Sequence, residues 1–340
     1  MAAPTIFDVA RRAGVSKSTV SKVLTRAPRV SAAARERVEA AIADLNYHPN
    51  TAARRLQSRR SQLIGLAFPH IEAYAPLPLF FSAFLSGAGT VAGRHGYDLV
   101  WLVSVANQEQ HDGYARAYLR REVDGLLLTD MLPSDPRISA LQRTACPFVI
   151  VGRYDLAAVY TVDVDNVAVG YLATRSLLAL GHTRIALLNG PRERLFCQDR
   201  YAGCARALAE SGLAVDEEHI SWSPFSEADG YEATRRLLSL RPRPTALIVT
   251  DTALQSGCLR ALQEAQLHIP EHCSLVGVAN ALSGSAGPPI TAVVQPVADL
   301  AAAAAQLLFR LIAGERPASR HRVLHPLFVE GPSTAPPPRL

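Results

Sequence analysis

The sequence TIFDVARRAGVSKSTVSKVL, residues 5–24, decides the fold of the N-terminal part of this chain. Its first half repeats apolar residues at helical spacing over residues 6–13, which predicts a short amphipathic helix. Gly14 follows, and glycine is the residue that tolerates positive φ where a helix ends. Ser16 is placed to cap a second helix over Lys17–Leu24. Two short helices about a glycine turn predict a helix-turn-helix.

The residues around this motif supply helix caps and a third helix. Thr5 and Asp8 match a capping box, in which a hydroxyl and a carboxylate satisfy backbone amides at a helix start. Ser31 is placed to cap a third helix, whose buried stripe is expected to comprise Val38, Ala41, Ile42 and Leu45. The second helix begins with short polar side chains that point outward, and these suit base edges in a major groove.

The net charge is concentrated at the N-terminus. Residues 1–60 hold twelve basic and four acidic residues, whereas the remaining 280 hold 23 basic and 26 acidic. A basic module on a slightly acidic body is typical of phosphate binding, although some small basic domains bind nothing. No apolar run reaches the ~18 residues that a membrane helix needs. Five scattered cysteines without a C-x-x-C pair, and an N-terminus unlike a secretory signal, predict reduced thiols and a cytoplasmic location.

Residues 5–66 resemble the headpiece of the lactose/galactose repressor (LacI/GalR) family. The matching elements occur in order and almost without gaps: D-V-A, A-G-V-S-x-x-T-V-S, R-x-x-V, A-x-x-x-L-x-Y-x-P-N and A-x-x-L. A lone helix-turn-helix match is weak evidence, but this ordered series is specific. The resemblance continues more loosely to about residue 330, and it implies a bacterial transcriptional regulator.

The resemblance also implies the DNA contacts of the headpiece. Base edges would be read by Lys17, Ser18 and Lys22. Phosphates or adjoining bases would be contacted by a second polar set, which comprises Thr5, Ser16, Thr19, Ser21 and Ser31. Lys22 stands where arginine is common, so a bidentate guanine contact becomes a single-point contact. Helix capping alone would also account for Ser16 and Ser31, and both roles are compatible because a capped N-terminus is an anion site.

A short segment after the headpiece is expected to act as a hinge. Asn50 is placed to cap a helix over Thr51–Ser58, whose eight residues fall below the ~12–15 that an isolated helix needs in water. In the family this segment folds in the DNA minor groove, where a leucine wedges between base pairs. The resemblance therefore implies DNA contacts by Asn50, Ala53 and Leu56, with Leu56 as the wedge. A buried linker leucine is the alternative.

From residue 62 the pattern changes to alternating strands and helices. Apolar runs such as Leu63–Phe68, Tyr97–Val105 and Phe148–Val151 are typical of buried parallel strands. This alternation predicts doubly wound sheets, and the resemblance implies two lobes that close around a ligand. The expected fold is therefore an all-α helix-turn-helix headpiece plus an α/β periplasmic-binding-protein-like sensor domain of two doubly wound parallel-sheet lobes.

The expected domain limits follow from these patterns. They are 1–49 for the headpiece, 50–61 for the hinge, and 62–340 for the effector-binding and dimerisation domain. The first lobe is expected at about 62–160 with a return segment near 291–320, and the second at about 161–290 with the C-terminal segment. The final residues, GPSTAPPPRL, do not match the leucine-heptad helix that makes the lactose repressor a tetramer. We therefore expect a homodimer on a near-palindromic operator.

Matching motifs nominate residues that would bind a small-molecule effector. In the segment GPRERLFCQDRYAG, Arg200 matches the family's ligand-binding arginine and Arg194 matches a second basic contact. The other candidates occupy pocket positions of the family and are Phe80, Phe81, Phe225, Asp251, Asn280 and Gln295. Core packing remains an alternative for Phe80, and an N-cap role remains one for Asp251.

The chain departs from the family after the strand that ends near Val278. The family usually has Gly-Tyr-Asp there, and the aspartate bonds ligand hydroxyls, whereas this chain reads Gly277-Val-Ala-Asn280. Loss of that acceptor, with Arg194 and Arg200 retained, suggests a negatively charged or less hydroxylated effector as a hypothesis.

The sequence favours a DNA-binding regulator, most simply a repressor, over two other classes of protein. A solute-binding protein would account for residues 62–330 but not for the basic headpiece. An enzyme would need a catalytic constellation, and the sequence presents no recognisable catalytic, metal or cofactor motif. The expected partners are double-stranded operator DNA, a sugar or related metabolite, and a second copy of the chain, with no membrane and no cofactor.

Overall fold

The computed structural model describes residues 4–24, 30–47, 60–68, 79–102, 111–129, 131–155, 158–280 and 290–338. The chain divides into two compact units, one that ends at Arg60 and one that begins at Ser61. The expected hinge residues Asn50, Ala53 and Leu56 lie outside the described residues, so their DNA contacts stay predictions.

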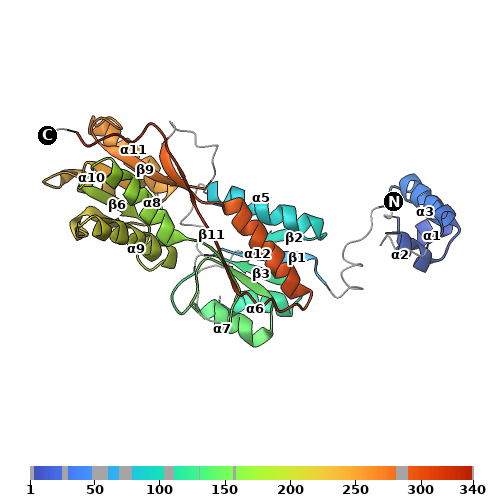
Figure 1. Cartoon of the computed structure of the whole chain (residues 1–340). Coiled ribbons are helices and arrows are strands. Elements are labelled where there is room, and N and C mark those ends of the chain that lie inside the picture. The colour runs from blue at the N-terminus through green and yellow to red at the C-terminus, as the bar shows by residue number, and fades with distance from the viewer. Residues whose placement is uncertain are drawn as a thin grey trace. The chain divides into compact units, whose positions relative to one another are not determined.

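The first unit contains the helix-turn-helix and the third helix that the sequence predicts (Figure 1). Its helices are α1 (Ile6–Ala13), α2 (Lys17–Leu24) and α3 (Ala32–Asp44). Each helix contributes one fully buried valine to a small core, namely Val9, Val20 and Val38. Gly14 ends α1 with a φ of 62°, a left-handed conformation that side-chain-bearing residues rarely adopt.

The second unit consists of two lobes, each built on a six-stranded sheet. The first lobe has the strand order β11-β5-β4-β3-β1-β2, with all neighbours parallel. Its strands are β1 (Leu63–Ala67), β2 (Asp98–Trp101), β3 (Gly125–Leu128), β4 (Phe148–Val151), β5 (Thr161–Val164) and β11 (His321–Leu324). One face packs on α5 (Leu79–Arg94) and α12 (Val297–Ile312), and the other on α6 (His111–Leu119) and α7 (Pro136–Thr144).

The second lobe repeats this arrangement with the order β12-β10-β9-β8-β6-β7. Its strands are β6 (Ile185–Asn189), β7 (Ile220–Trp222), β8 (Ala246–Val249), β9 (Ser274–Ala279), β10 (Thr291–Val294) and β12 (Leu327–Val329). All neighbours are parallel except β12, which runs antiparallel to β10. One face packs on α8 (Asn166–Ala179) and α9 (Leu195–Glu210), and the other on α10 (Glu227–Ser239) and α11 (Thr252–Glu264).

The chain passes between the lobes three times: after β5, after β10, and between β11 and β12. These crossings correct the expected lobe limits by a few residues. Residues 161–164 belong to the first sheet, because β5 pairs with β4, and residues 291–294 belong to the second, because β10 pairs with β9. The return segment therefore begins at α12, which lies beside α5 in Figure 1 and continues through β11.

Several strands differ from expectation in length or were not expected. β2 covers Asp98–Trp101, and residues 103–105 of the longer strand expected there lie outside the described residues. The strands β5, β7, β11 and β12 have only three or four residues each, and so few residues give no readable alternation.

Paired glycines bring the helices of the second lobe close together. A Cβ on Gly170 of α8 would overlap the backbone carbonyl of Arg200, and one on Gly203 of α9 would overlap the backbone of α8. Gly230 and Gly257 allow the same close crossing of α10 and α11. The α8–α9 crossing therefore fixes the backbone of Arg200 beside the start of α8, which directly follows the crossing from the first lobe.

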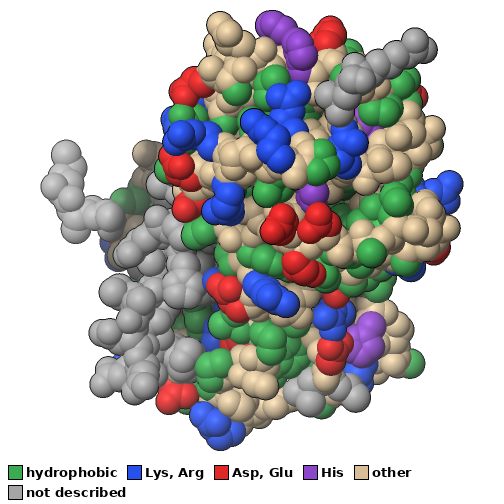
Figure 2. Space-filling model, turned by 90° about the vertical axis from the view of Figure 1, so that its left-hand side faces the viewer, with side chains coloured by type: hydrophobic (Ala, Val, Ile, Leu, Met, Phe, Trp, Pro, Cys, Tyr) green, Lys and Arg blue, Asp and Glu red, His purple; other side chains and the backbone are tan. Residues whose placement is uncertain are grey.

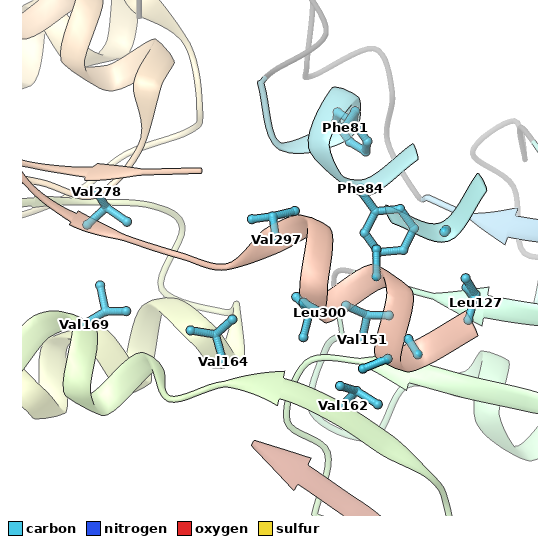
Figure 3. Close-up of a cluster of buried hydrophobic side chains, with 14 of the residues drawn as sticks. Phe81, Phe84, Leu127, Val151, Val162, Val164, Val169, Val278, Val297 and Leu300 are labelled. Carbon is cyan, nitrogen blue, oxygen red and sulfur yellow. The ribbon is translucent and has the colours of Figure 1, made fainter. Parts of the chain in front are cut away.

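A shared apolar core joins the two lobes beside the crossings. Figure 3 shows Val297 and Leu300 of α12 among side chains from α5 and the first sheet. Val164 at the end of β5 and Val169 of α8 continue the same cluster toward Val278 of the second sheet. The segments that link the lobes are thus packed from both sides.

On the face drawn in Figure 2, acidic, basic and hydrophobic side chains are interspersed. None of the helices in the described part of the chain is long and apolar enough to cross a membrane.

Candidate functional site

The outward face of α2 carries the residues that the sequence nominates for base reading. Lys17, Ser18 and Lys22 are exposed, whereas Thr19 and Ser21 are half-buried. Exposed cationic and hydroxyl side chains on the helix after the turn are available to phosphates and base edges. The structure therefore brings the base-reading candidates onto one short helix, and their contact with DNA stays a prediction.

Three hydroxyl residues of the expected DNA-binding set lie at helix starts. The Asp8 carboxylate accepts hydrogen bonds from the amide of Thr5 at 2.9 Å and from its hydroxyl at 2.7 Å. These bonds, chiefly that from the hydroxyl, hold the pKa of Asp8 below its usual value. The Ser16 hydroxyl accepts from the amide of Thr19 at 3.2 Å, and Ser31 accepts from an amide in the first turn of α3 at 3.3 Å. Ser16 and Ser31 therefore form the helix-capping hydrogen bonds that were the alternative to DNA contact.

Phe7 is an exposed residue of α1 that the sequence did not nominate. Its side chain is 59% exposed, and the Nζ atom of Lys17 lies 4.8 Å from the centre of its ring. This cation–π contact between α1 and α2 orients the Lys17 side chain. The sequence could have indicated Phe7, because it is an aromatic residue on the polar face of α1, opposite the apolar stripe of that helix.

A cavity of about 140 Å³ lies between the lobes, at the carboxyl ends of their strands. This is where ligands bind in doubly wound sheets. From the first lobe it is lined by Phe68, Phe80, Phe81, Thr129, Val151, Gly152, Asp163, Val164 and Leu300. From the second lobe and the connecting segments it is lined by Asn166, Phe196, Arg200, Phe225, Thr250, Asp251, Asn280 and Gln295.

Arg200 is the central cation of this cavity and is only 5% exposed. Its guanidinium donates to Asn166 Oδ1 at 3.1 Å, to the carbonyl of Thr250 at 2.8 Å and to Gln295 Oε1 at 3.0 Å. Gln295 in turn donates to Asn280 Oδ1 at 3.0 Å. Burial lowers the pKa of Arg200, but arginine stays protonated throughout the physiological range. The network therefore fixes the guanidinium plane before any ligand arrives.

Two carboxylates face the same cavity. Asp251 caps α11 by accepting from the amides of Ala253 at 2.7 Å and Leu254 at 3.3 Å, so its N-cap role and its cavity position coexist. Burial raises the pKa of Asp251. Burial also raises the pKa of Asp163, at the end of β5, to about 7. With one guanidinium between them, the ionised cavity would carry a net negative charge.

The aromatic wall of the second lobe depends on a glycine. Phe196 and Phe225 stack with their ring centres 6.0 Å apart, and the guanidinium of Arg200 lies 5.0 Å from the Phe196 ring. A Cβ on Gly190 would overlap the Phe225 ring, so only glycine lets this ring take its position. Such a wall suits the apolar face of a flat or ring-shaped ligand.

The structure gathers nearly all effector candidates at one place. Seven of the eight line the cavity: Phe80, Phe81, Arg200, Phe225, Asp251, Asn280 and Gln295. Arg194 is the exception, because it precedes α9 as its N-cap residue and does not line the cavity. Phe80 serves both alternatives, since it lines the cavity and also stacks on Phe84 of the core.

Sequence reasoning missed six polar or aromatic residues of the cavity, namely Phe68, Thr129, Asp163, Asn166, Phe196 and Thr250. Thr129 and Thr250 directly follow buried strands, which is the signal that could have found them. Asp163 and Asn166 lie on the unexpected strand β5 and just after it. No group of acidic, histidine or cysteine side chains suited to a metal ion occurs among the described residues.

An ion pair links the two lobes outside the lining of the cavity. Arg153, which follows β4 of the first lobe, donates through Nε to Asp199 of α9 at 3.0 Å. Arg153 also pairs with Asp155. These acidic partners raise the pKa of Arg153, with Asp199 as the largest cause. The contact adjoins Arg200 and adds an electrostatic link to the apolar packing of the lobes.

Two family models match the chain. Residues 5–50 match the model described as bacterial regulatory proteins, lacI family, and residues 174–334 match the periplasmic binding protein-like domain. The HTH-type transcriptional regulator CelR of Thermobifida fusca is 32% identical over 316 residues, which cover 92% of this chain and 93% of that protein.

Solved structures agree over the full length. The lac repressor dimer bound to operator and the anti-inducer ONPF is 28% identical with a TM-score of 0.84, covering 98% of this chain and 100% of that one. A complex of the transcriptional regulator CelR with cellobiose is 29% identical with a TM-score of 0.74, covering 97% and 99%. The match extends over headpiece and sensor body together.

Proposed function

Because the chain belongs to the lacI family of bacterial regulatory proteins, we propose that it represses transcription by binding a near-palindromic operator as a dimer. A sugar or related metabolite in the inter-lobe cavity controls this binding. The observation that carries the proposal is the polar cavity around Arg200, to which both lobes contribute, in a chain that also bears a basic helix-turn-helix.

Operator recognition is supported by the charge and exposure of the headpiece. Lys17, Ser18 and Lys22 read base edges in this proposal, while Thr5 and the hydroxyls of the helix caps contact phosphates. Dimerisation is supported by similarity to the lac repressor dimer, and a two-fold axis matches a palindromic site. The protein would act in the cytoplasm, where the chromosome is and where its five buried thiols stay reduced.

The effector is proposed to be neutral rather than acidic. The hypothesis of a negatively charged ligand loses its basis, since Arg194 does not line the cavity whereas Asp163 and Asp251 do. Aromatic rings beside amide and carboxylate groups favour a hydroxylated ring compound. Similarity to a regulator solved with cellobiose supports a sugar.

Selection of bound fragments from the sheared source genome, followed by footprinting, tests the proposal. We expect a protected, roughly palindromic site, and genes beside it that nominate effectors. Bound fragments that share no motif, with affinity that vanishes at physiological salt, would leave only counterion-driven binding and would refute the operator proposal. Effector control is tested on the selected site, where a ligand must change the dissociation constant in anisotropy titrations.

A further inference from the structure

Asp163 is a carboxylate of the cavity whose hydrogen bonds within the protein are incomplete. Its Oδ1 accepts from the amide of Val164 at 2.8 Å and from Asn166 Nδ2 at 3.4 Å. Its Oδ2 has no hydrogen-bond partner among the described residues, although the side chain lines the cavity. A carboxylate oxygen that lines a cavity without a donor from the protein is available to a ligand that donates a hydrogen bond to it.

The cations around Asp163 are already engaged elsewhere. Arg153 pairs with Asp199 and Asp155, and Arg200 bonds Asn166, the carbonyl of Thr250 and Gln295. Asp199 on α9 adds a second negative charge close to Asp163. The net field at Asp163 therefore opposes a ligand anion and favours a hydrogen-bond donor.

The remaining charged neighbours of β5 have partners of their own. On the adjacent strand β11, His321 bonds the hydroxyl of Thr161 through Nδ1 at 2.9 Å. At the start of α8, Asp165 accepts from the amide of Ala168 at 2.8 Å and lies 3.8 Å from His325. Across the cavity, Asp251 uses one oxygen to cap α11. None of these groups neutralises Asp163.

The aspartate acceptor that the family resemblance places at the end of β9 is missing, because Ala279 stands there. Asn280 lines the cavity there, but its Oδ1 already accepts from Gln295 Nε2. A ligand hydroxyl near Asn280 would therefore meet an amide oxygen that already accepts a hydrogen bond. The unbonded oxygen of Asp163 is therefore the stronger acceptor.

We infer that Asp163 binds the effector from the first lobe, by accepting a hydrogen bond from a hydroxyl of a neutral, polyhydroxylated ligand, and so replaces the aspartate acceptor for which this chain has Ala279. The inference rests on the proposed function, because it names the ligand class of the same cavity. It also assigns specificity: a ligand that presents an acid to Asp163 is rejected.

This role has a proton-linked consequence. Since burial raises the pKa of Asp163 to about 7, part of the ligand-free protein carries a protonated Asp163 at neutral pH. A hydroxyl that donates to Oδ2 favours the ionised form, so ligand binding lowers that pKa and releases a proton. We expect release of about half a proton per site at pH 7, and almost none at pH 9 where Asp163 is already ionised.

Calorimetric titration of the full-length protein tests the inference with D-glucose, D-glucosamine, D-glucuronate and cellobiose. Titrations in two buffers of different ionisation enthalpy give the number of protons released. Asp163→Asn keeps the shape and removes the charge, and it should weaken the best neutral sugar about 10- to 100-fold and abolish proton release. Asp163→Ser, expected to cause the same loss, serves as the second variant.

Asp155→Asn is the matched control, because Asp155 lies near Arg153 but does not line the cavity. It should leave affinity and proton release unchanged. Equal affinity of wild type and Asp163→Asn would overturn the inference while the effector proposal stands. Tighter binding of D-glucuronate than of any neutral sugar would also overturn it. Binding of no compound up to about 10 mM, with operator binding intact, would overturn both the inference and the sugar proposal.

Discussion

On the headpiece, Lys17 and Lys22 stand exposed on α2, whereas Arg200 in the cavity is 5% exposed and bonded to three neighbours. Both regions hold cations proposed for recognition, but those on α2 border on solvent whereas Arg200 is buried. A substitution on α2 therefore removes one contact, while a substitution in the cavity leaves buried partners without hydrogen bonds. The same change of side chain should thus cost far more in the cavity.

The largest loss of stability is expected from Arg200→Leu. It leaves Asn166 Oδ1, Gln295 Oε1 and the Thr250 carbonyl without their donor, which should lower the free energy of unfolding by about 3 kcal/mol or more. Urea denaturation measures the loss. Arg206→Leu on the same helix is the control, because Arg206 is half-exposed and should change stability by less than about 1 kcal/mol. Equal losses would contradict the difference between buried and exposed cations.

A pH-dependent effect is expected from Asp163→Asn. The folded pKa of about 7 lies above the unfolded value of 3.8, so folding favours the protonated form. Stability from this group is fully present below pH 3.8 and is lost as pH rises through 7. Replacement by Asn should therefore raise the free energy of unfolding by up to about 4 kcal/mol at pH 8 and by less than about 1 kcal/mol near pH 4. Thermal melts across this range test the prediction, and a gain that does not depend on pH would contradict it.

A smaller effect is expected from Gly190→Ala. The added methyl group must displace the Phe225 ring, which should cost about 1.5 kcal/mol of stability and weaken effector binding. Gly93→Ala is the control, because a Cβ there meets nothing within 4 Å on α5 and should stabilise the helix by about 0.5–1 kcal/mol. In thermal melts we expect Gly190→Ala to lower stability and Gly93→Ala to raise it. A Gly190→Ala variant with unchanged stability would show that the Phe225 ring can shift at little cost in free energy.

The smallest effect on free energy is expected from Lys22→Ala on the headpiece. Loss of one exposed cation should weaken operator binding by about 1 kcal/mol without a change in the stability of the fold. Anisotropy titrations at several salt concentrations separate two roles. A uniform loss over all sequences with a salt slope lower by about one indicates a phosphate contact. A loss confined to one operator position indicates base reading, and Lys22→Arg should then restore affinity where that base is guanine.

The headpiece was predictable because its signals are local. Gly14 ends a helix within ten residues of its start, and caps such as Ser31 act within one turn. The cavity was predictable only as far as the family motifs reached. Arg200 and Gln295 lie 95 residues apart in sequence and meet through a hydrogen bond, so spacing alone could not pair them. Asp163 escaped notice because its strand, β5, has only four residues.

The sequence by itself determined the helix-turn-helix, the alternation that builds two parallel sheets, and the family to which the chain belongs. These features follow from periodicity, capping and ordered motifs, all of which are properties of neighbouring residues. Only the tertiary structure decided that Arg194 stays outside the cavity, that Asp163 lines it, and that Arg200 donates hydrogen bonds to three neighbours there. These outcomes depend on where the chain crosses between the lobes and on which polar groups become buried beside one another. Burial depends on contacts between residues far apart in the sequence, so it cannot be read from neighbouring residues.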